Sequence, residues 1–198
     1  MRYIADTVDF ELEEPTVVTL GKFDGRHRGH QKLLRTMEEV KETLGYATAI
    51  FTFSTAPLTL VTGETATVIT TSEERRHNME KMGIDYLVEY PFTDDVRKMD
   101  PAVFVKDILV KRMKAKAVVV GPDCSFGYKG AGNVELLRTL SRELDFRLYV
   151  IEKEKDHRRD ISSTYIREEL SRGNVAKANE LLGEPYAIHG IVVHGNHI

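Results

Sequence analysis

The sequence predicts an α/β fold built on a doubly wound, mostly parallel sheet, and two patterns carry that prediction. Short apolar runs of strand length alternate with amphipathic stretches of helical length through almost all of the 198 residues. Helix-capping residues stand where several of the amphipathic stretches begin. Strands that alternate with helices in this way are typical of βαβ units with right-handed crossovers, which produce parallel sheets.

In the first half of the chain, the alternation begins at residue 17. In order, we expect a strand at 17–20, a helix at 31–44, a strand at 47–53, a helix from Thr71 to about Gly83 and a strand at 86–89. The strands are apolar runs, and the first helix carries apolar residues at helical spacing along one face. Thr71 and Glu74 form a capping-box pattern, and Gly83 is a typical residue for ending the helix that they begin.

The second half continues the same alternation. In order, we expect a helix beginning at Pro101, a strand at 117–120, a helix from Asn133 to Leu144, a strand at 146–151, a helix after Ile161 and a short helix from about Asn174 to Leu182. Pro is favoured at the first helical position, and Asn, Ser and Thr are favoured caps. Residues 152–160 are dense in charge and predict a solvated loop, with a flap beside a functional site as the alternative.

Composition excludes several classes of protein. The chain has 28 Lys and Arg against 31 Asp and Glu, so its net charge of −3 gives no support for a nucleic-acid partner. No apolar run is long enough to span a bilayer, and the N-terminus lacks the apolar segment of a signal peptide. The single cysteine, Cys124, cannot form an intrachain disulfide. We therefore expect a cytoplasmic protein without nucleic-acid or membrane partners.

The turn at residues 21–30 is the strongest functional signal in the chain. Its sequence, Gly-Lys-Phe-Asp-Gly-Arg-His-Arg-Gly-His, lies between an apolar strand and an amphipathic helix. A turn that follows a strand and opens a helix is a natural anion site, because unpaired backbone N–H groups and the positive end of the helix dipole face the ligand. Glycine allows a close backbone approach, and His27 and His30 are expected to add side-chain donors. The turn predicts a polyphosphate site.

Two further segments follow strands and should meet this turn at the carboxyl edge of the sheet. Residues 121–127 follow the strand at 117–120, and residues 161–167 follow the strand at 146–151. In the second segment, hydroxyls gather at a helix start and one guanidinium lies about a turn further on; these residues are Ser162, Ser163, Thr164 and Arg167. Hydroxyls, helix N–H groups and a guanidinium together form a second phosphate cradle.

Three common motifs are absent, and several side chains allow two interpretations. The chain has no G-x-x-x-x-G-K-[ST], no G-x-G-x-x-G after the first strand and no G-x-S-x-G, which argues against a P-loop enzyme, a standard dinucleotide dehydrogenase and a serine hydrolase. Asp24 can bind ligand or brace the turn, and Asp123 can orient a ligand or cap a turn. Lys22 can contact phosphate or be solvated. We expect Cys124 to be semi-buried without a redox role.

Taken together, the two phosphate motifs resemble a known family. The pattern G-x-F-D-G-x-H-x-G-H at 21–30, with I-S-S-T-x-I-R at 161–167, is similar to the adenylyltransferase module of the bacterial bifunctional riboflavin kinase/FMN adenylyltransferases, also called FAD synthetases. These belong to the nucleotidylyltransferase superfamily. The resemblance covers roughly residues 15 to 198 and implies a Rossmann-like, doubly wound parallel sheet of the nucleotidylyltransferase type.

The resemblance implies transfer of AMP from ATP to the phosphate of FMN, giving FAD and pyrophosphate, with Mg²⁺ accompanying ATP. It implies catalytic roles at the ATP phosphates for His27, His30 and Arg167. The other nucleotide-binding residues that it implies are Gly21, Phe23, Asp24, Gly25, Gly29, Ser162, Ser163 and Thr164. It assigns no side chain to the metal. Transfer of this kind depends on alignment and charge stabilisation more than on covalent help from the protein.

On the flavin side, the resemblance implies the residues Phe53, Pro57, Asp123 and Phe126. The family usually has F-x-P-x-P after the second strand, whereas this chain has Thr55 in place of the first Pro. Residues 1–184 are expected to form the adenylyltransferase domain. Residues 185–198 resemble the beginning of a riboflavin kinase domain that does not continue, so we expect no riboflavin kinase activity in this chain.

Two other functions stay open at the level of sequence. One is a nucleotidylyltransferase with a different phosphorylated acceptor, against which the G-x-F-D-G form of the turn argues. The other is a non-catalytic regulator that binds flavin or nucleotide, against which the complete set of His27, His30 and Arg167 argues. Conversion of ATP and FMN to FAD separates both from the leading prediction.

Overall fold

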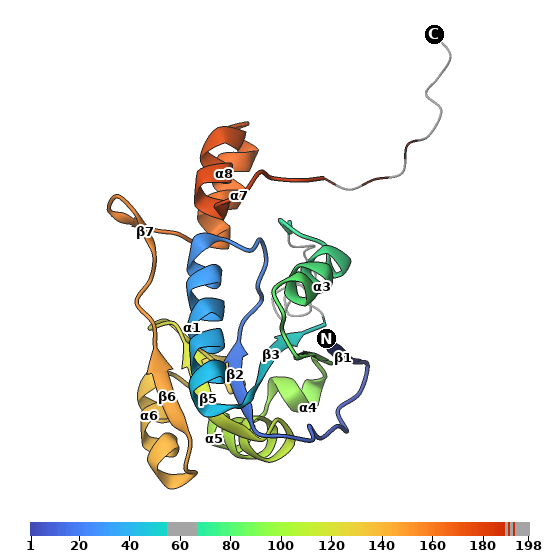
Figure 1. The fold of residues 1–198 in the computed structure, drawn as a ribbon, viewed down its shortest axis with the longest axis vertical. Coiled ribbons are helices and arrows are strands. Elements are labelled where there is room, and N and C mark those ends of the chain that lie inside the picture. Colours follow the sequence, from blue (N-terminus) through green and yellow to red (C-terminus); the bar gives the residue numbers. More distant parts are fainter. Residues whose placement is uncertain (55–66, 189, 191, 193–198) are drawn as a thin grey trace.

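A six-stranded parallel sheet forms the centre of the computed structural model, which describes residues 1–54, 67–188, 190 and 192 (Figure 1). Its strands are β1 (Arg2–Ala5), β2 (Thr16–Leu20), β3 (Ala47–Phe53), β4 (Tyr86–Tyr90), β5 (Ala115–Val120) and β6 (Arg147–Val150). They lie in the order β1-β4-β3-β2-β5-β6, and every neighbouring pair is parallel. The predicted parallel α/β sheet is therefore confirmed.

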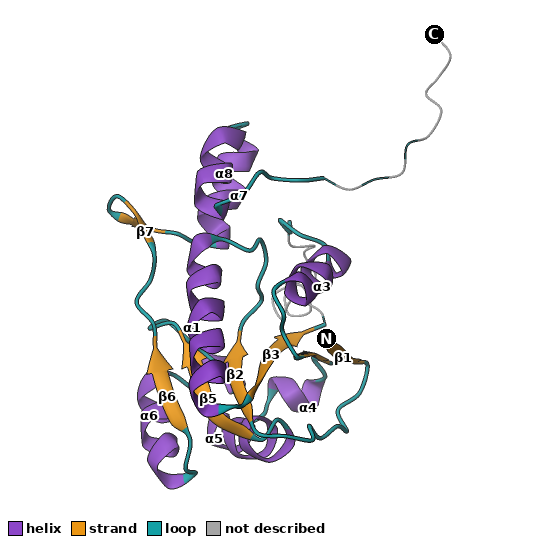
Figure 2. Cartoon of the chain, in the orientation of Figure 1, coloured by secondary structure: helices purple, strands orange, loops and turns teal. Residues whose placement is uncertain are grey.

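Helices connect the strands and cover both faces of the sheet (Figure 2). They are α1 (Arg28–Leu44), α3 (Ser72–Lys81), α4 (Asp94–Arg97), α5 (Pro101–Val103), the π-helix η1 (Phe104–Arg112), the short 3₁₀ turn η2 (Tyr128–Gly130), α6 (Val134–Glu143), α7 (Ser163–Ser171) and α8 (Val175–Leu182). Thr71 and Glu74 form the predicted capping box of α3, and Asn133 caps α6. Asp100 caps the helix that begins at Pro101.

Alternate side chains of the strands enter two apolar clusters on opposite faces, as a doubly wound sheet requires. On β5, Val118 and Val120 pack with residues of η1 and α6. Ala117 and Val119 of the same strand pack with residues of α1 and α3 on the other face. A third cluster joins α7 and α8 to Ile69, which precedes α3. Figure 1 shows α7 and α8 beyond the N-terminal end of α1.

The structure differs from the expected elements in several places, and the short helices α4 and η2 were not expected. The edge strand β1 was not predicted, because its side chains are exposed or half-buried and give no apolar run. Helix α1 begins at Arg28, three residues before the expected start, since the ring of His27 acts as its N-cap. Residues 152–160, expected as a loop, contain a small antiparallel hairpin of β7 (Lys155–Asp156) and β8 (Arg159–Asp160).

The final segment is described only in part. Residues 185–188, 190 and 192 form no helix or strand, and residues 189, 191 and 193–198 lie outside the described part of the chain. The interpretation of 185–198 as the beginning of a kinase domain stays a prediction. Within residues 1–54 and 67–188, no helix is long and apolar enough to cross a membrane.

Candidate active site

The carboxyl ends of β2 and β5 lie side by side at the point where the chain winds in opposite directions. From β2 it proceeds through β3 to β4, whereas from β5 it proceeds to β6 on the other side. Such a switch point is where open α/β sheets bind their ligands. The turn after β2, residues 21–27, and the loop after β5, residues 121–130, both begin here. The expected meeting of these segments is confirmed.

Strained backbone shapes the turn after β2. Phe23 has φ +50° although it carries a side chain, and its ring is only 2% exposed in the core beneath α1. Gly25 has φ +65°, and a Cβ there would lie 2.8 Å from Ile69. Only glycine avoids both costs at this position. Because the Phe23 ring is buried, only the backbone of this residue could make the predicted contact with nucleotide.

His27 and His30 stack on each other, with ring centroids 3.6 Å apart. The ring of His27 accepts a hydrogen bond at Nδ1 from the backbone N–H of His30 (3.3 Å), whereas Nδ1 of His30 lies 3.0 Å from the carbonyl oxygen of Gly25. A carbonyl only accepts, so Nδ1 of His30 carries a proton. Burial lowers the pKa of His27 to about 3 and that of His30 to about 4. Both rings are therefore neutral at pH 7.

These bonds fix the tautomers of the two rings. Neutral His27, which accepts at Nδ1, presents Nε2–H as a donor, whereas neutral His30, which donates at Nδ1, presents Nε2 as an acceptor. The expectation of two side-chain donors therefore needs correction, because in this structure only His27 has a free N–H. His30 can donate toward a ligand only after it takes up a second proton. Gly29 leaves room for this arrangement, since a Cβ there would lie 3.1 Å from the His27 ring.

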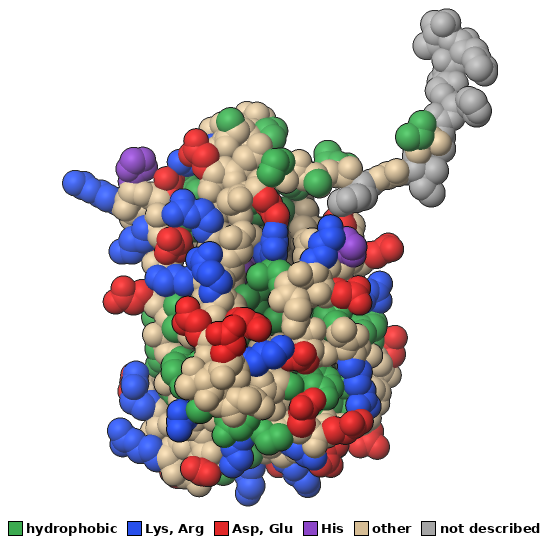
Figure 3. Space-filling model, viewed as in Figure 1, with side chains coloured by type: hydrophobic (Ala, Val, Ile, Leu, Met, Phe, Trp, Pro, Cys, Tyr) green, Lys and Arg blue, Asp and Glu red, His purple; other side chains and the backbone are tan. Residues whose placement is uncertain are grey.

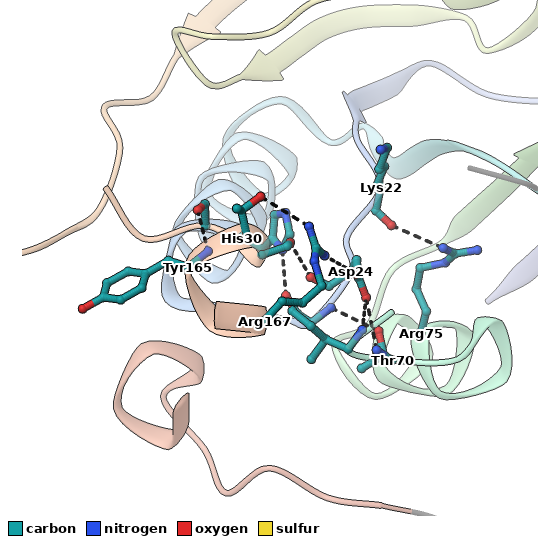
Figure 4. A network of polar contacts seen from close by, with 12 residues as sticks. Lys22, Asp24, His30, Thr70, Arg75, Tyr165 and Arg167 are labelled. Carbon is teal, nitrogen blue, oxygen red and sulfur yellow. Dashed lines mark hydrogen bonds and ion pairs between the residues drawn. The ribbon is translucent and has the colours of Figure 1, made fainter. Parts of the chain in front are cut away.

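Asp24 is the centre of a buried polar network that joins three parts of the chain (Figure 4). Its Oδ1 accepts from the backbone N–H groups of Ile69 (2.7 Å) and Thr70 (3.1 Å), which lead into α3. Its Oδ2 lies 2.6 Å from Nη1 of Arg167, and its carbonyl oxygen accepts from the hydroxyl of Ser163 (2.6 Å). Of the two interpretations of Asp24, this geometry supports the brace.

The beginning of α7 brings its hydroxyls to the same network. Ser162 caps the helix by accepting from the N–H of Tyr165 (3.2 Å), and the hydroxyl oxygen of Thr164 accepts from Arg167 (3.3 Å). Both hydroxyls therefore keep their own hydrogens for a ligand, whereas Ser163 already donates to Asp24. The two predicted phosphate motifs are therefore in direct contact: Ser163 and Arg167 of α7 bind Asp24, which lies in the turn before α1.

A cavity of about 880 Å³ opens on the other side of the turn. Its lining includes the aromatic rings of Phe51, Phe53, Phe92, Phe104 and Phe126. Gly21 and Lys22 line it from the turn after β2, and Asp123 lines it from the loop after β5. Three of the residues predicted for flavin, Phe53, Asp123 and Phe126, therefore share one cavity. The fourth, Pro57, lies outside the described residues.

The loop after β5 is tied to the segment that leads into α7. Lys153 lies 2.8 Å from Asp123 and 3.2 Å from Asp160, so one ammonium joins the cavity wall to the strand just before Ile161. Burial raises the pKa of the neighbouring Cys124 to about 12, which keeps its sulfur a neutral thiol and a poor nucleophile.

A buried ion pair between Arg75 and Glu89 supports the turn and was missed by sequence reasoning. Arg75 Nη2 lies 2.5 Å from Glu89, and its Nη1 donates to the carbonyl oxygen of Lys22 at 3.4 Å. Glu89 also accepts from the hydroxyl of Tyr3 (2.6 Å); burial and this bond raise the pKa of Tyr3 to about 12. A glutamate inside an apolar strand was the available signal, because a buried carboxylate requires a partner.

Lys and Arg side chains also gather outside the cavity. Figure 3 shows them on the left of the molecule, over the β7–β8 hairpin and the beginning of α1. Arg28, Lys32 and Arg159 belong to these elements, and each lies within ion-pair distance of a glutamate. Arg28 and Lys32 share Glu154, whereas Arg159 pairs with Glu168, so these three charges are partly compensated within the chain.

A family model described as FAD synthetase matches residues 9–165. Proteins named bifunctional riboflavin kinase/FMN adenylyltransferase match nearly the whole chain. That of Bacillus subtilis is 33% identical over 190 residues, which is 94% of this chain and 59% of the relative. That of Escherichia coli K12 is 33% identical over 187 residues, which is 94% of this chain and 60% of the relative. The chain thus spans about 60% of the length of these curated relatives.

Solved structures give the same fold. A Streptococcus pneumoniae structure described as a macrolide-efflux protein superimposes with a TM-score of 0.83 and 28% identity, covering 98% of this chain and 64% of that chain. Pantothenate synthetase from Thermus thermophilus has a TM-score of 0.55 and 16% identity, covering 92% and 81%. The second likeness, at 16% identity, extends to the fold alone.

Proposed function

The chain belongs to the FAD synthetase family, and we propose that it transfers an adenylyl group from ATP to the phosphate of FMN. A phosphate oxygen of FMN forms a bond to the α-phosphorus of ATP, and the bond from that phosphorus to the oxygen bridging to the β-phosphorus breaks. The products are FAD and pyrophosphate. Residues 1–184 would perform this reaction.

One observation carries the proposal: a single turn separates an aromatic cavity from a phosphate cradle. Gly21 and Lys22 line the cavity, and Asp24 contacts Ser163 and Arg167 of the cradle. A flavin ring suits the aromatic cavity, and a polyphosphate suits two helix N-termini with hydroxyls and a guanidinium. An acceptor phosphate and an α-phosphorus held on the two sides of this turn would approach each other across it.

On the ATP side, each group has a role that its present bonds allow. The Nε2–H of His27 and the free hydroxyl hydrogens of Ser162 and Thr164 would donate to phosphate oxygens. Arg167 would release its ion pair with Asp24 and bind the departing pyrophosphate instead. His30, neutral here, would gain a proton beside the triphosphate, because a nearby negative charge favours the charged form of the ring.

Mg²⁺ is proposed as a companion of ATP rather than as a resident of the protein. Among the described residues, no group of three or more His, Cys, Asp or Glu side chains is placed to hold a metal ion. The Asp24 carboxylate in the cradle is already engaged by two N–H groups and Arg167. Phosphate oxygens and water would therefore coordinate the ion, which would neutralise phosphate charge.

The deciding experiment incubates the protein with ATP, Mg²⁺ and FMN and follows FAD and pyrophosphate together. We expect the two products in equal amounts, and much slower turnover when FMN is replaced by another phosphorylated acceptor such as phosphopantetheine. Binding of FMN without formation of FAD would contradict the proposed reaction and favour a non-catalytic flavin-binding role. Faster turnover of the other acceptor would reassign the substrate.

A further inference from the structure

Lys22 occupies the boundary between the aromatic cavity and the phosphate cradle. Its side chain lines the cavity, and two residues further along the same turn Asp24 contacts Arg167. The cavity is also lined by Arg97, Lys98 and Lys129, which belong to α4, its C-terminal end and η2. Of these cations, Lys22 alone belongs to the turn that carries Asp24 and leads into His27.

The ammonium of Lys22 has no protein partner within residues 1–54 and 67–188, and its side chain is exposed. An exposed lysine is common and carries no argument alone. Here, however, the cation lies at the wall of an apolar cavity, where the other lining residues of the turn and of β3 are uncharged. The Lys22 ammonium could therefore pair with an anionic group of a ligand bound in the cavity.

The backbone at Lys22 is anchored on both sides, so the position of its Cα is fixed. Its carbonyl oxygen accepts from Arg75, which is anchored on buried Glu89. The next residue, Phe23, is locked into the core with a positive φ. Figure 4 shows the Lys22 side chain directed away from the pair of Asp24 and Arg167. The ammonium is therefore available to a ligand in the cavity rather than to one bound beside Arg167.

We propose that Lys22 binds the phosphate of FMN and brings it to the α-phosphorus of ATP, an inference that rests on the proposed function. With the flavin ring in the cavity, the phosphate must lie at the end nearest the cradle, where the bond to ATP forms. That phosphate carries nearly two negative charges at pH 7, as phosphate monoesters do. An ammonium there offsets its repulsion from the triphosphate, and no proton transfer by Lys22 is required.

The test compares FMN with riboflavin, which has the same ring system and lacks the phosphate. In the Lys22→Met variant without ATP, we expect the affinity for FMN to fall about tenfold or more, the usual loss for a hydrogen bond to a charged group. The affinity for riboflavin should stay within about twofold, because no charged contact is lost. Quenching of flavin fluorescence measures both affinities.

Two matched variants complete the design. Lys22→Arg retains the charge and should recover most of the affinity for FMN. Lys129→Met removes a different cation of the cavity wall and should leave the ratio of FMN affinity to riboflavin affinity unchanged. The thermal unfolding temperature of each variant shows whether it is folded.

Several results would overturn the assignment of Lys22. An equal loss of affinity for FMN and riboflavin would make it a contact of the flavin ring, and no loss for either would make it a solvated lysine. A weakened affinity for ATP, measured as a Kd, with unchanged FMN binding would place it on the triphosphate. Because these are binding measurements, they judge Lys22 even if no FAD forms, whereas formation of FAD judges the proposed function separately.

Discussion

Nη1 of Arg167 lies 2.6 Å from Oδ2 of Asp24, and this ion pair joins α7 to the turn after β2 across 143 residues of sequence. The same guanidinium is the group proposed to hold pyrophosphate. Asp24 and the ATP phosphates would therefore compete for Arg167, and nucleotide binding would replace one charged contact by another. The pair also explains how the cradle keeps its shape, because Asp24 is fixed by two further N–H groups.

We expect Arg167→Met to lower kcat by about 100-fold or more, the usual loss for a group that stabilises charge in the transition state. It should also lower the unfolding free energy by about 1–3 kcal/mol, because the buried Asp24 carboxylate loses its charged partner and keeps only two backbone N–H donors. Arg172→Met, at the C-cap of α7 and paired with Glu169, is the control and should retain activity. Near-normal turnover of Arg167→Met would remove this residue from the mechanism.

Asp24→Ala should destabilise the fold by about 1–3 kcal/mol, because the N–H groups of Ile69 and Thr70 lose their acceptor in a buried place. Asp24→Asn keeps an amide oxygen for these donors and should cost less. Urea unfolding of the two variants compares them directly. Equal destabilisation by both substitutions would mean that the ion pair with Arg167, and not the bonds to the backbone, makes Asp24 important to the fold.

The buried histidines predict a loss of stability in acid. The folded-state pKa of His27, about 3, lies below its unfolded value of about 6.5, so the unfolded chain binds the proton more tightly. The contribution is complete above pH 6.5 and is lost as the pH falls toward 3, at about 1.4 kcal/mol per pH unit. Unfolding free energy should therefore decrease between pH 6.5 and 4, where His30 adds in the same direction.

His27→Asn is the matched variant for this effect, because Asn is a favourable N-cap and does not titrate in this range. It should flatten the dependence of unfolding free energy on pH while leaving α1 capped. An unchanged slope in this variant would assign the acid sensitivity to other groups.

Gly25→Ala should destabilise the protein more than Gly45→Ala. Both glycines have positive φ, +65° and +69°, so both substitutions carry a backbone cost of about 1 kcal/mol. At Gly25 a new Cβ would also lie 2.8 Å from Ile69, whereas at Gly45 nothing lies within 4 Å. The difference between the two unfolding free energies measures the collision with Ile69. Equal losses of unfolding free energy in the two variants would mean that Ile69 can move away from the new Cβ without a measurable cost.

Sequence patterns were sufficient for five of the six strands of the sheet, for most of the helices between them and for the three segments that meet at its carboxyl edge. Periodicity and caps are local properties, and Thr71 with Glu74 shows how well they fix a helix start. The capping role of His27 was not foreseen, because a histidine ring is an uncommon cap and only its fold-back onto the N–H of His30 shows it.

The roles of individual side chains at the site could not be predicted from the sequence, because they depend on contacts between residues far apart in the chain. The bonds that hold Asp24 come from Ile69, Thr70 and Arg167, which no local pattern brings together. The state of His30 depends on which ring nitrogen faces the carbonyl of Gly25. Arg75 lies on a helix that looks wholly solvated in sequence, yet it pairs with buried Glu89 beneath the turn.

The central claim is that adenylyl transfer joins the two sides of the turn after β2. The most direct test supplies ATP labelled at its α-phosphorus together with FMN and Mg²⁺, and follows where the label goes. We expect the label to enter FAD in proportion to the unlabelled pyrophosphate released. Label recovered in ADP or in free AMP, with FMN unchanged, would contradict it.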